Sequence, residues 1–398
     1  MSTKVYFLGG TSPQGFKSKF IEQIKKSGYY TYILKGGPGT GKSTLMKKIA
    51  KEFEDSPVSV YYCSSDINSL DAVVIEDRKI IVVDGTAPHV FEALYPAVSQ
   101  EIINLGEYWD KSKMKGKEEA VRECFDENQK YHNRVRCYVE AFSSLNTDIY
   151  NLAENCLDKA KLDSYIKRLA RKVIPKSKTD KQGKKEFKQL SAFTTENYMT
   201  LKSDNNYSRY FINDDYFAGS DYLLRSLSDM FTDAGYDVTV SECNMLHNSI
   251  YEHIVIEELK LMFTTGNFFN KLKNELDKLM LYKINDKIIN RNDIDLLTVE
   301  NIDDSIYDLV NCILKNDNEN VINFMRFYHK DKLSAKKQRI SFDKKASLEL
   351  AEEAAESLET ALKIHDELEK YYINAIDFDR LNDMSENFIK MLKTLPEV

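Results

Sequence analysis

The sequence has few cysteines, and none lies in a pattern that would bind a metal ion. Its six cysteines are scattered along 398 residues, with no CxxC pair and no histidine at the spacing of a metal ligand. This excludes the common zinc motifs and a disulfide framework. Scattered thiols are typical of proteins in a reducing compartment, so we expect a cytoplasmic protein.

Long apolar runs are also missing. No segment approaches the length needed to cross a bilayer, and the N-terminal residues MSTKVYFLGG lack the basic leader and apolar stretch of a secretory signal. Apolar residues make up 42% and charged residues 30% of the chain, which is an ordinary globular balance. We therefore expect a soluble protein of two domains, with no membrane partner.

Positive charge is not in excess, because the net charge is -7. This argues against a nucleic-acid footprint over the whole chain. A lysine-rich stretch, PKSKTDKQGKKEFK, runs from Pro175 to Lys188 and has almost nothing to bury. It could touch phosphates, but its composition favours a solvated linker, and nucleic acid is not a favoured partner.

The first quarter of the chain alternates apolar runs with helical stretches. The runs are Val5 to Leu8, Tyr32 to Leu34, Val58 to Cys63 and Ile80 to Val83. Strands of this kind, separated by crossover helices, predict an α/β fold with a parallel sheet and helices on its faces.

Two long helical stripes follow the α/β regions. From about Glu118 to Cys156 apolar residues recur at steps of three and four, interrupted by Asn128, and a possible helix cap lies at residues 143–148. The second stripe consists of Leu348, Ala351, Ala355, Leu358, Leu362 and His365. Packing against the chain's own helices is the favoured interpretation, and contact with a protein partner or a second copy is the alternative.

An internal repeat divides the chain. The segment GKSTLMKKIAKEF, from Gly41 to Phe53, matches GSDYLLRSLSDMF, from Gly219 to Phe231, and the flanking strands match in the same order. We predict a tandem duplication of P-loop NTPase-like domains with parallel sheets, each followed by long helices. The predicted boundaries are a first domain over residues 1–174, a basic linker over 175–186, and a second domain over 187–398.

The first copy contains an intact P-loop motif, GxxxxGK(S/T), which follows a strand and opens a helix. Glycines there let backbone N–H groups converge on a phosphate, and the helix directs its positive N-terminal end at the same point. Lys42 would reach the β- and γ-phosphate oxygens, and Ser43 would bind Mg²⁺, with Thr44 beside it. The predicted nucleotide-binding residues are Gly36, Gly37, Pro38, Gly39, Thr40, Gly41, Lys42, Ser43 and Thr44.

A second motif lies downstream, where the apolar strand KIIVV ends at Asp84. This is the form of a Walker B strand, and Asp84 would hold Mg²⁺ through water. Gly85 follows it where many ATPases have a glutamate that polarises water, so slow turnover is expected. The candidate catalytic bases are Asp66, His89 and Glu92, each of which could equally be a turn or capping residue.

The second copy differs where the chemistry would lie. The residues DDYFAGSD, from Asp214 to Asp221, stand in place of GGPGTGKS, and the lysine is replaced by Ser220. Three aspartates put negative charge where a triphosphate would sit, and the segment that matches Asp84 has no carboxylate. We expect no nucleotide site in this copy.

The chain resembles a family of two-domain P-loop ATPases of spore-forming Gram-positive bacteria, some of which are labelled nucleotide kinases. The resemblance rests on GGTSPQGF, GGPGTGKSTLMKKI, CSSDINSLDAVVI, VVDGTAPHV, EIINLGEYWD and HDELEKYY. It implies an ATP-side surface of Asp66, Ser69, Asp71, Asp84, Gly85, Thr86, His89, Glu101, Asn104 and Gly106. Members of this family often carry a second P-loop, and this sequence departs from that pattern.

Three functions are compatible with these features. The first is a Mg²⁺-dependent ATPase whose second domain is silent. The second is a small-molecule or nucleotide kinase, although no acceptor signature is evident. The third is an ATP-gated scaffold with little turnover. ATP is favoured over GTP, because the only near match to a guanine-reading motif, Ser177 to Asp180, lies in the linker.

Overall fold

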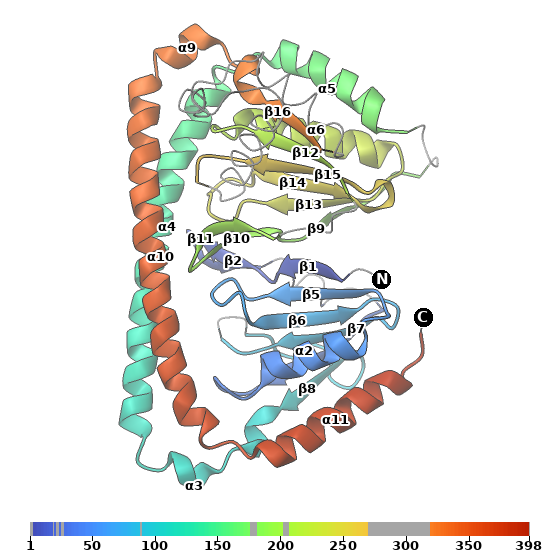
Figure 1. The fold of residues 1–398 in the computed structure, drawn as a ribbon, viewed down its shortest axis with the longest axis vertical. Helices are drawn as coiled ribbons and strands as arrows, with labels where there is room; N and C mark the ends of the chain where they lie inside the picture. Colours follow the sequence, from blue (N-terminus) through green and yellow to red (C-terminus); the bar gives the residue numbers. More distant parts are fainter. Residues whose placement is uncertain are drawn as a thin grey trace, which may run out of the picture. The chain divides into compact units, whose positions relative to one another are not determined.

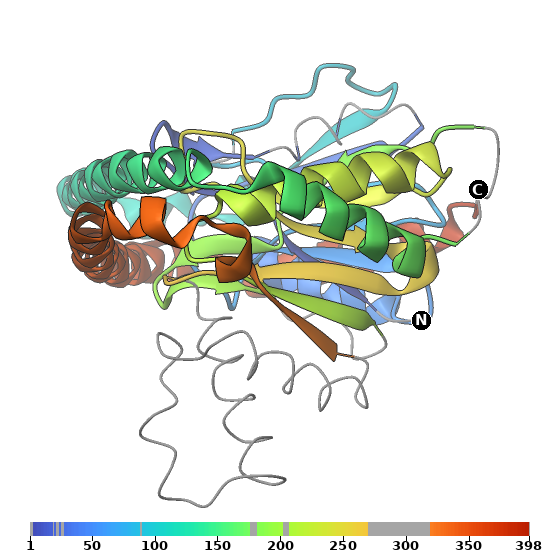
Figure 2. The same ribbon diagram turned by 90° about the horizontal axis from the view of Figure 1, so that it is seen from above.

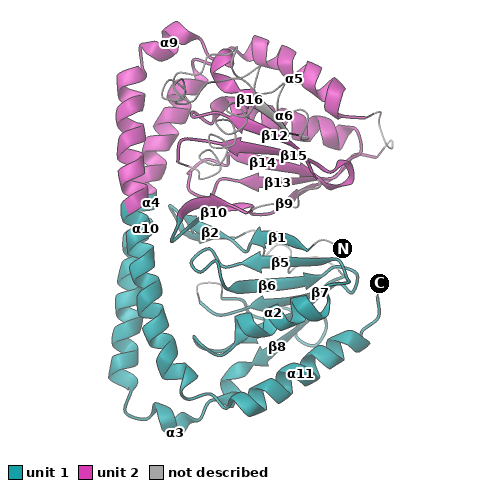
Figure 3. Cartoon of the chain, in the orientation of Figure 1, with its two compact units in different colours: residues 1–139, 193–196, 353–398 teal, residues 140–192, 197–352 magenta. Residues whose placement is uncertain are grey.

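The computed structural model of the chain divides into two compact units (Figure 3). Unit 1 contains residues 1–139, 193–196 and 353–398, and unit 2 contains residues 140–192 and 197–352. The structure describes residues 3–18, 20, 24, 28–87, 90–175, 181–201, 207–269 and 319–397. Each unit is described below by itself.

Unit 1 is built on a six-stranded sheet with the strand order β1-β5-β6-β7-β4-β8 (Figure 1). The strands are β1 (Lys4–Phe7), β4 (Tyr30–Lys35), β5 (Val58–Tyr62), β6 (Leu70–Ile75), β7 (Ile80–Asp84) and β8 (Gln100–Asn104). A separate hairpin joins β2 (Gly10–Ser12) to β3 (Gly15–Lys17). The parallel neighbours β7 and β8 flank β4, so the ends of these three strands meet at one edge of the sheet.

The prediction of an α/β fold with two sheet-bearing halves is confirmed, but the prediction of purely parallel sheets is wrong. Strand β6 is antiparallel to both of its neighbours, β5 and β7. The reason is the length of the connection, because only residues 76–79 lie between β6 and β7. A parallel crossover needs a dozen residues or more, whereas a short turn suffices for an antiparallel pair.

Burial explains why these segments form strands and a helix. All six residues of β6 are buried, and so are the four central residues of β4, as expected for strands covered on both faces. The helix α2 (Lys42–Glu52) buries Leu45, Met46 and Ile49 on one stripe. This stripe packs on β6 and β7, which fixes the start of α2 above the edge of the sheet.

Unit 2 repeats this sheet. Its order is β16-β12-β15-β14-β13-β9, and the parallel and antiparallel pairings match those of unit 1 strand by strand. The strands are β9 (Lys185–Phe187), β12 (Ser208–Asn213), β13 (Val238–Glu242), β14 (Tyr251–Ile256), β15 (Leu261–Gly266) and β16 (Glu319–Asn323). A hairpin of β10 (Ser191–Thr194) and β11 (Asn197–Thr200), whose residues 193–196 are assigned to unit 1, follows β9 as β2 and β3 follow β1. The repeat in the sequence therefore coincides with a repeat of strand order.

The remaining elements are helical. They are η1 (Leu105–Tyr108), α3 (Lys111–Met114), α4 (Glu118–Glu154), α5 (Lys159–Val173), α6 (Ala218–Asp233), η2 (Glu257–Leu259), η6 (Phe324–Phe327), α9 (Lys330–Ser334), α10 (Lys337–Ile373) and α11 (Phe378–Thr394). In unit 2, α6 packs on β14 and α5 lies beside α6 (Figure 2). None of the helices in the described ranges combines the length and the apolarity that a bilayer span requires.

The two predicted stripes pack against each other within the chain. Helix α4 is continuous through residues 143–148, so no cap restarts it there. In unit 1 the Asn128 side chain, which interrupts the apolar stripe, donates a hydrogen bond of 2.7 Å to the carbonyl of Ala361 on α10. In unit 2 the buried Asn146 side chain donates to Ser347 Oγ at 3.0 Å. Polar residues in the seam thus fix how the two helices pair.

The division into units differs from the predicted boundaries at 174 and 187. The C-terminal helix α11 packs on α2, and its residues Phe388, Ile389 and Leu392 share a core with β4 and β7. Helix α5 instead belongs to unit 2, where its apolar stripe packs on α6. The cause is that α4 and α10 each contain residues of both units. Helix α5, which follows α4, therefore packs in the core of unit 2, and α11, which follows α10, packs in the core of unit 1.

Replacing Leu392 by alanine tests this arrangement. Leu392 is fully buried against the first sheet, so we expect Leu392→Ala to destabilise unit 1 by about 2–5 kcal/mol. Denaturant unfolding, with hydrogen exchange read at the amides of β4 and β7, would measure the effect. The matched control is Lys390→Ala on the exposed face of the same helix, and equal stabilities of the two variants would contradict the arrangement.

Candidate functional site

The loop at residues 36–41 connects β4 to α2 at the edge where the parallel strands end. Gly39 and Gly41 have φ angles of 67° and 80°, in the left-handed region that favours glycine. Helix α2 begins directly after Gly41 and has no side-chain cap. The first N–H groups of a helix have no partner inside it, so this end of α2 favours an anion.

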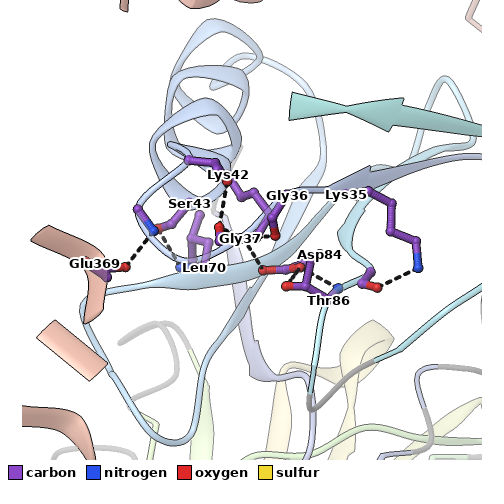
Figure 4. A network of polar contacts seen from close by, with 12 residues as sticks. Lys35, Gly36, Gly37, Lys42, Ser43, Leu70, Asp84, Thr86 and Glu369 are labelled. Carbon is purple, nitrogen blue, oxygen red and sulfur yellow. Dashed lines mark hydrogen bonds and ion pairs between the residues drawn. The ribbon is translucent and has the colours of Figure 1, made fainter. Parts of the chain in front are cut away.

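The Lys42 side chain turns back over the loop (Figure 4). Its Nζ donates to the carbonyl oxygens of Gly36 at 3.1 Å and Gly37 at 2.9 Å. It also lies 3.7 Å from Oδ2 of Asp84, at the end of the neighbouring strand β7. The structure therefore brings the predicted lysine and carboxylate together, because Leu34 and Asp84 are partners in the register of two parallel strands.

The hydroxyl residues of the motif have different surroundings. Ser43 Oγ accepts a hydrogen bond of 3.0 Å from the N–H of Leu70, the first residue of β6. Thr40 is buried, and its Oγ1 donates to the carbonyl of Gly37 at 2.9 Å, which fixes the path of the loop backbone. Thr44 is exposed on the first turn of α2. Only Ser43 thus combines a position beside Lys42 with a contact to the sheet edge.

Asp84 is held in one orientation by the next turn. Its Oδ1 accepts hydrogen bonds from Thr86 N at 2.8 Å and from Thr86 Oγ1 at 2.6 Å. A Cβ atom at Gly85 would lie 2.3 Å from Cγ2 of Ile33, so a side chain cannot follow Asp84 unless the Ile33 side chain on β4 is displaced. The glycine after Asp84 therefore fits the packing of Ile33 against this turn.

The predicted bases are occupied or lie outside the described residues. Asp66 accepts hydrogen bonds from Asn68 N and Ser69 Oγ. These bonds make it a capping residue of its own turn, which was the alternative interpretation. Glu92 is exposed and pairs with Lys35 at 2.8 Å. His89 lies outside the described residues. No base candidate that the structure describes is hydrogen-bonded to Lys42 or Asp84.

Other residues implied by the resemblance shape nearby turns. Asn104 ends β8 and its Oδ1 accepts from Gly106 N at 3.0 Å, which starts η1. Asp71 is buried in β6 next to Leu70, and its charge contributes with burial to raising the pKa of the Cys63 thiol. Glu101 is exposed on β8 and contributes to the raised pKa of Tyr32, after burial as the main cause.

Residues of α10 and the residue after η1 contact the loop and were missed by sequence reasoning. Glu369 on α10 accepts a hydrogen bond from Gly39 N through Oε1 at 3.0 Å. Trp109 lies against Gly37, and its ring centroid is 5.2 Å from that of Tyr372 on α10. The segment HDELEKYY contains Glu369 and Tyr372, but a helical stripe does not indicate which loop it will meet.

The counterpart loop of unit 2 is closed by its own carboxylate. Helix α6 starts at Ala218, so Gly219 and Ser220 are helical where the first copy has an open loop. Asp214 is buried and its Oδ2 accepts from Ser220 N at 2.7 Å. Tyr328 OH donates to Asp214 and accepts from Gly219 N at 2.9 Å. Burial raises the pKa of Asp214, while these hydrogen bonds oppose the rise.

Two further positions differ between the copies. Asp221, which matches Ser43, accepts from Tyr251 N at 2.7 Å, and Tyr251 is the first residue of β14 just as Leu70 is of β6. Asp221 also pairs with Arg225 at 2.8 Å. Thr265 takes the register position of Asp84. The scaffold is thus kept, while the lysine and the carboxylate of the sheet edge are absent.

Unit 2 also contains a serine–histidine pair. Ser191 Oγ lies 2.6 Å from Nε2 of His253, and both residues are fully buried. Burial lowers the pKa of His253 to about 3, so its ring is neutral at pH 7. A pair with no access to solvent cannot meet a substrate, and we assign it a structural role.

The Asp214 contacts generate a stability prediction. Asp214→Ala leaves the Ser220 N–H at the start of α6 without its acceptor, so we expect unit 2 to lose about 1–3 kcal/mol. Asp215→Ala is the matched control, because the Asp215 carboxylate is partly exposed and pairs with Lys344, a contact worth about 0–1 kcal/mol. Thermal and denaturant unfolding of the two variants would measure the difference. A loss no greater than that of Asp215→Ala would refute the role of Asp214.

Comparisons with known proteins do not identify the chain. No protein-family model matches it, and neither a curated protein nor a solved structure does. The resemblance to two-domain P-loop ATPases therefore stays a prediction. The chemistry assigned to the loop at residues 36–43 rests on its own geometry.

Proposed function

We propose that the chain binds ATP with Mg²⁺ at Gly36 to Ser43 and hydrolyses it slowly, while the second unit binds no nucleotide. The observation that carries this proposal is the juxtaposition at the sheet edge. An uncapped helix follows a loop with two left-handed glycines, and Lys42 lies 3.7 Å from Asp84. Converging N–H groups, a lysine and a carboxylate are the parts that a magnesium triphosphate requires.

Each residue has a role in this proposal. The loop N–H groups bind phosphate oxygens, and Lys42 exchanges the carbonyls of Gly36 and Gly37 for the β- and γ-phosphates. Ser43 and Asp84 hold Mg²⁺, which neutralises charge on the phosphates. Lys42 is nine-tenths buried beside Asp84, so its charge is poorly screened by water and acts strongly on a bound anion.

Slow turnover follows from the surroundings of Asp84. Gly85 has no room for a side chain, Asp66 caps its own turn and Glu92 pairs with Lys35. The same observations favour a second candidate function, a scaffold that is gated by ATP and turns over little. A partner or a second copy would then recognise the state with bound nucleotide.

The lysine tests the proposal. We expect Lys42→Ala to weaken MgATP binding by about ten- to a hundredfold, because a charge-assisted contact with the phosphates is lost. Isothermal titration calorimetry would measure this, with Lys47→Ala on the exposed face of α2 as the matched control. If Lys42→Ala and Lys47→Ala bound MgATP as the unaltered protein does, the proposed site would be wrong.

Phosphate release then separates the functions. Release from ATP that depends on Lys42 and needs no acceptor indicates an ATPase. Loss of ATP only in the presence of metabolites indicates a kinase, and binding without turnover indicates the gated scaffold.

A further inference from the structure

The last turns of α10 lie on the loop at residues 36–41. Glu369 Oε1 accepts a hydrogen bond from Gly39 N at 3.0 Å (Figure 4). A Cβ atom on Gly39 would be only 2.7 Å from Cγ1 of Ile373 and 3.2 Å from the carbonyl oxygen of Glu369. This approach is possible only because Gly39 has no side chain. The contact therefore depends both on the glycine at position 39 and on the position of the end of α10.

Other contacts in unit 1 fix the end of α10 at this place. Tyr372 packs on Trp109, which lies against Gly37. Beyond α10, Ile376 and Leu381 share a small core with Leu105, at the start of η1. The position of Glu369 over the loop thus depends on several packed residues and not on one surface contact.

The Glu369 carboxylate occupies an N–H group that a phosphate would also bind. The N–H of Gly39 belongs to the set of loop amides that would bind phosphate oxygens, and a carboxylate is an anion that accepts the same hydrogen bond. Both anions cannot occupy one N–H group. A triphosphate that enters the loop must therefore displace Glu369 or lose this donor.

We infer that Glu369 is an intramolecular anion that competes with phosphate for the loop, and that nucleotide binding releases the end of α10 from it. The inference rests on the proposed function, because it names how the same site is regulated. Helix α10 contains residues of both units. Release of its end by nucleotide would therefore act on a helix that the two units share.

Unit 2 also has a carboxylate at the corresponding loop, where it binds an N–H group in the first turn of α6. There the anion is Asp214, which lies in the loop itself, is buried and binds Ser220 N. In unit 1 the carboxylate comes from another helix, and the Glu369 side chain is 33% exposed. A carboxylate on a separate, partly hydrated side chain can leave the loop without unfolding it, whereas Asp214 cannot.

The test compares three variants. Glu369→Gln keeps the size of the side chain and removes its charge, and Glu369→Ala also removes the acceptor. Glu367→Gln is the matched control, because it removes the same charge from an exposed position two residues away. We expect MgATP to bind about tenfold more tightly to Glu369→Gln, at least as tightly to Glu369→Ala, and unchanged to Glu367→Gln.

A second readout follows α10 itself. Trp109 is the single tryptophan of the chain and packs against Tyr372 with the two rings tilted, so its fluorescence reports whether α10 stays on the loop. MgATP should change the emission of the unaltered protein, and part of that change should be present in Glu369→Ala before nucleotide is added. Adenosine, which has no phosphate, should bind equally to all variants.

The outcomes separate the inference from the proposed function. Equal MgATP affinity of the unaltered protein and Glu369→Gln, or weaker binding by Glu369→Gln, would overturn the role of Glu369 and leave the proposal of ATP binding in place. If neither protein bound MgATP and Lys42→Ala made no difference, both the proposed ATP site and the role of Glu369 would be wrong. Tighter binding by Glu369→Gln with no gain in Glu367→Gln supports the inference.

Discussion

The unsatisfied backbone N–H groups of the loop and first helical turn that follow a central strand are the constraint on which both halves of this chain depend. Each half places a helix directly after a central strand, at the edge where parallel strands end. Those N–H groups need an acceptor, and the two halves supply it differently. In unit 2 Asp214 of the loop accepts from Ser220 N in the first turn of α6, whereas in unit 1 Glu369 reaches from α10 and accepts from Gly39 N in the loop before α2. The presence or absence of an internal carboxylate thus separates a closed loop from an open one.

The path of the helices places that second carboxylate. Because α4 and α10 each continue from one unit into the other, the helix that closes the first core comes from the end of the chain. Helix α11 packs on α2 through Phe388 and Leu392, while the end of α10 reaches the loop. The stability of unit 1 and the state of its loop consequently depend on the same C-terminal segment.

Local sequence was sufficient for the parts of the site that lie close together in the chain. The glycines, Lys42 and Ser43 are set by the spacing of one motif, and Asp84 ends a strand that must neighbour β4. The antiparallel turn of β6 was also predictable, because residues 76–79 are too few for a crossover. An all-parallel sheet was the wrong prediction because strand composition was weighed without connection length.

The remaining features needed the three-dimensional structure. An amphipathic stripe records that a helix is half buried but not which surface covers it, so neither the destination of α11 nor the contact of Glu369 could be predicted. For carboxylates in turns, the sequence alone does not separate a catalytic base from a capping residue. Asp66 carries a carboxylate at a strand end, as a catalytic base would, and only its hydrogen bonds to Asn68 and Ser69 identify it as a cap.

The central claim is that one loop of the two takes a triphosphate, and hydrogen exchange with and without MgATP tests it most directly. The account predicts slower exchange at residues 36–44, faster exchange near Glu369 at the end of α10, and no change at residues 214–221. Unchanged exchange at residues 36–44, or protection of residues 214–221 in their place, would contradict it.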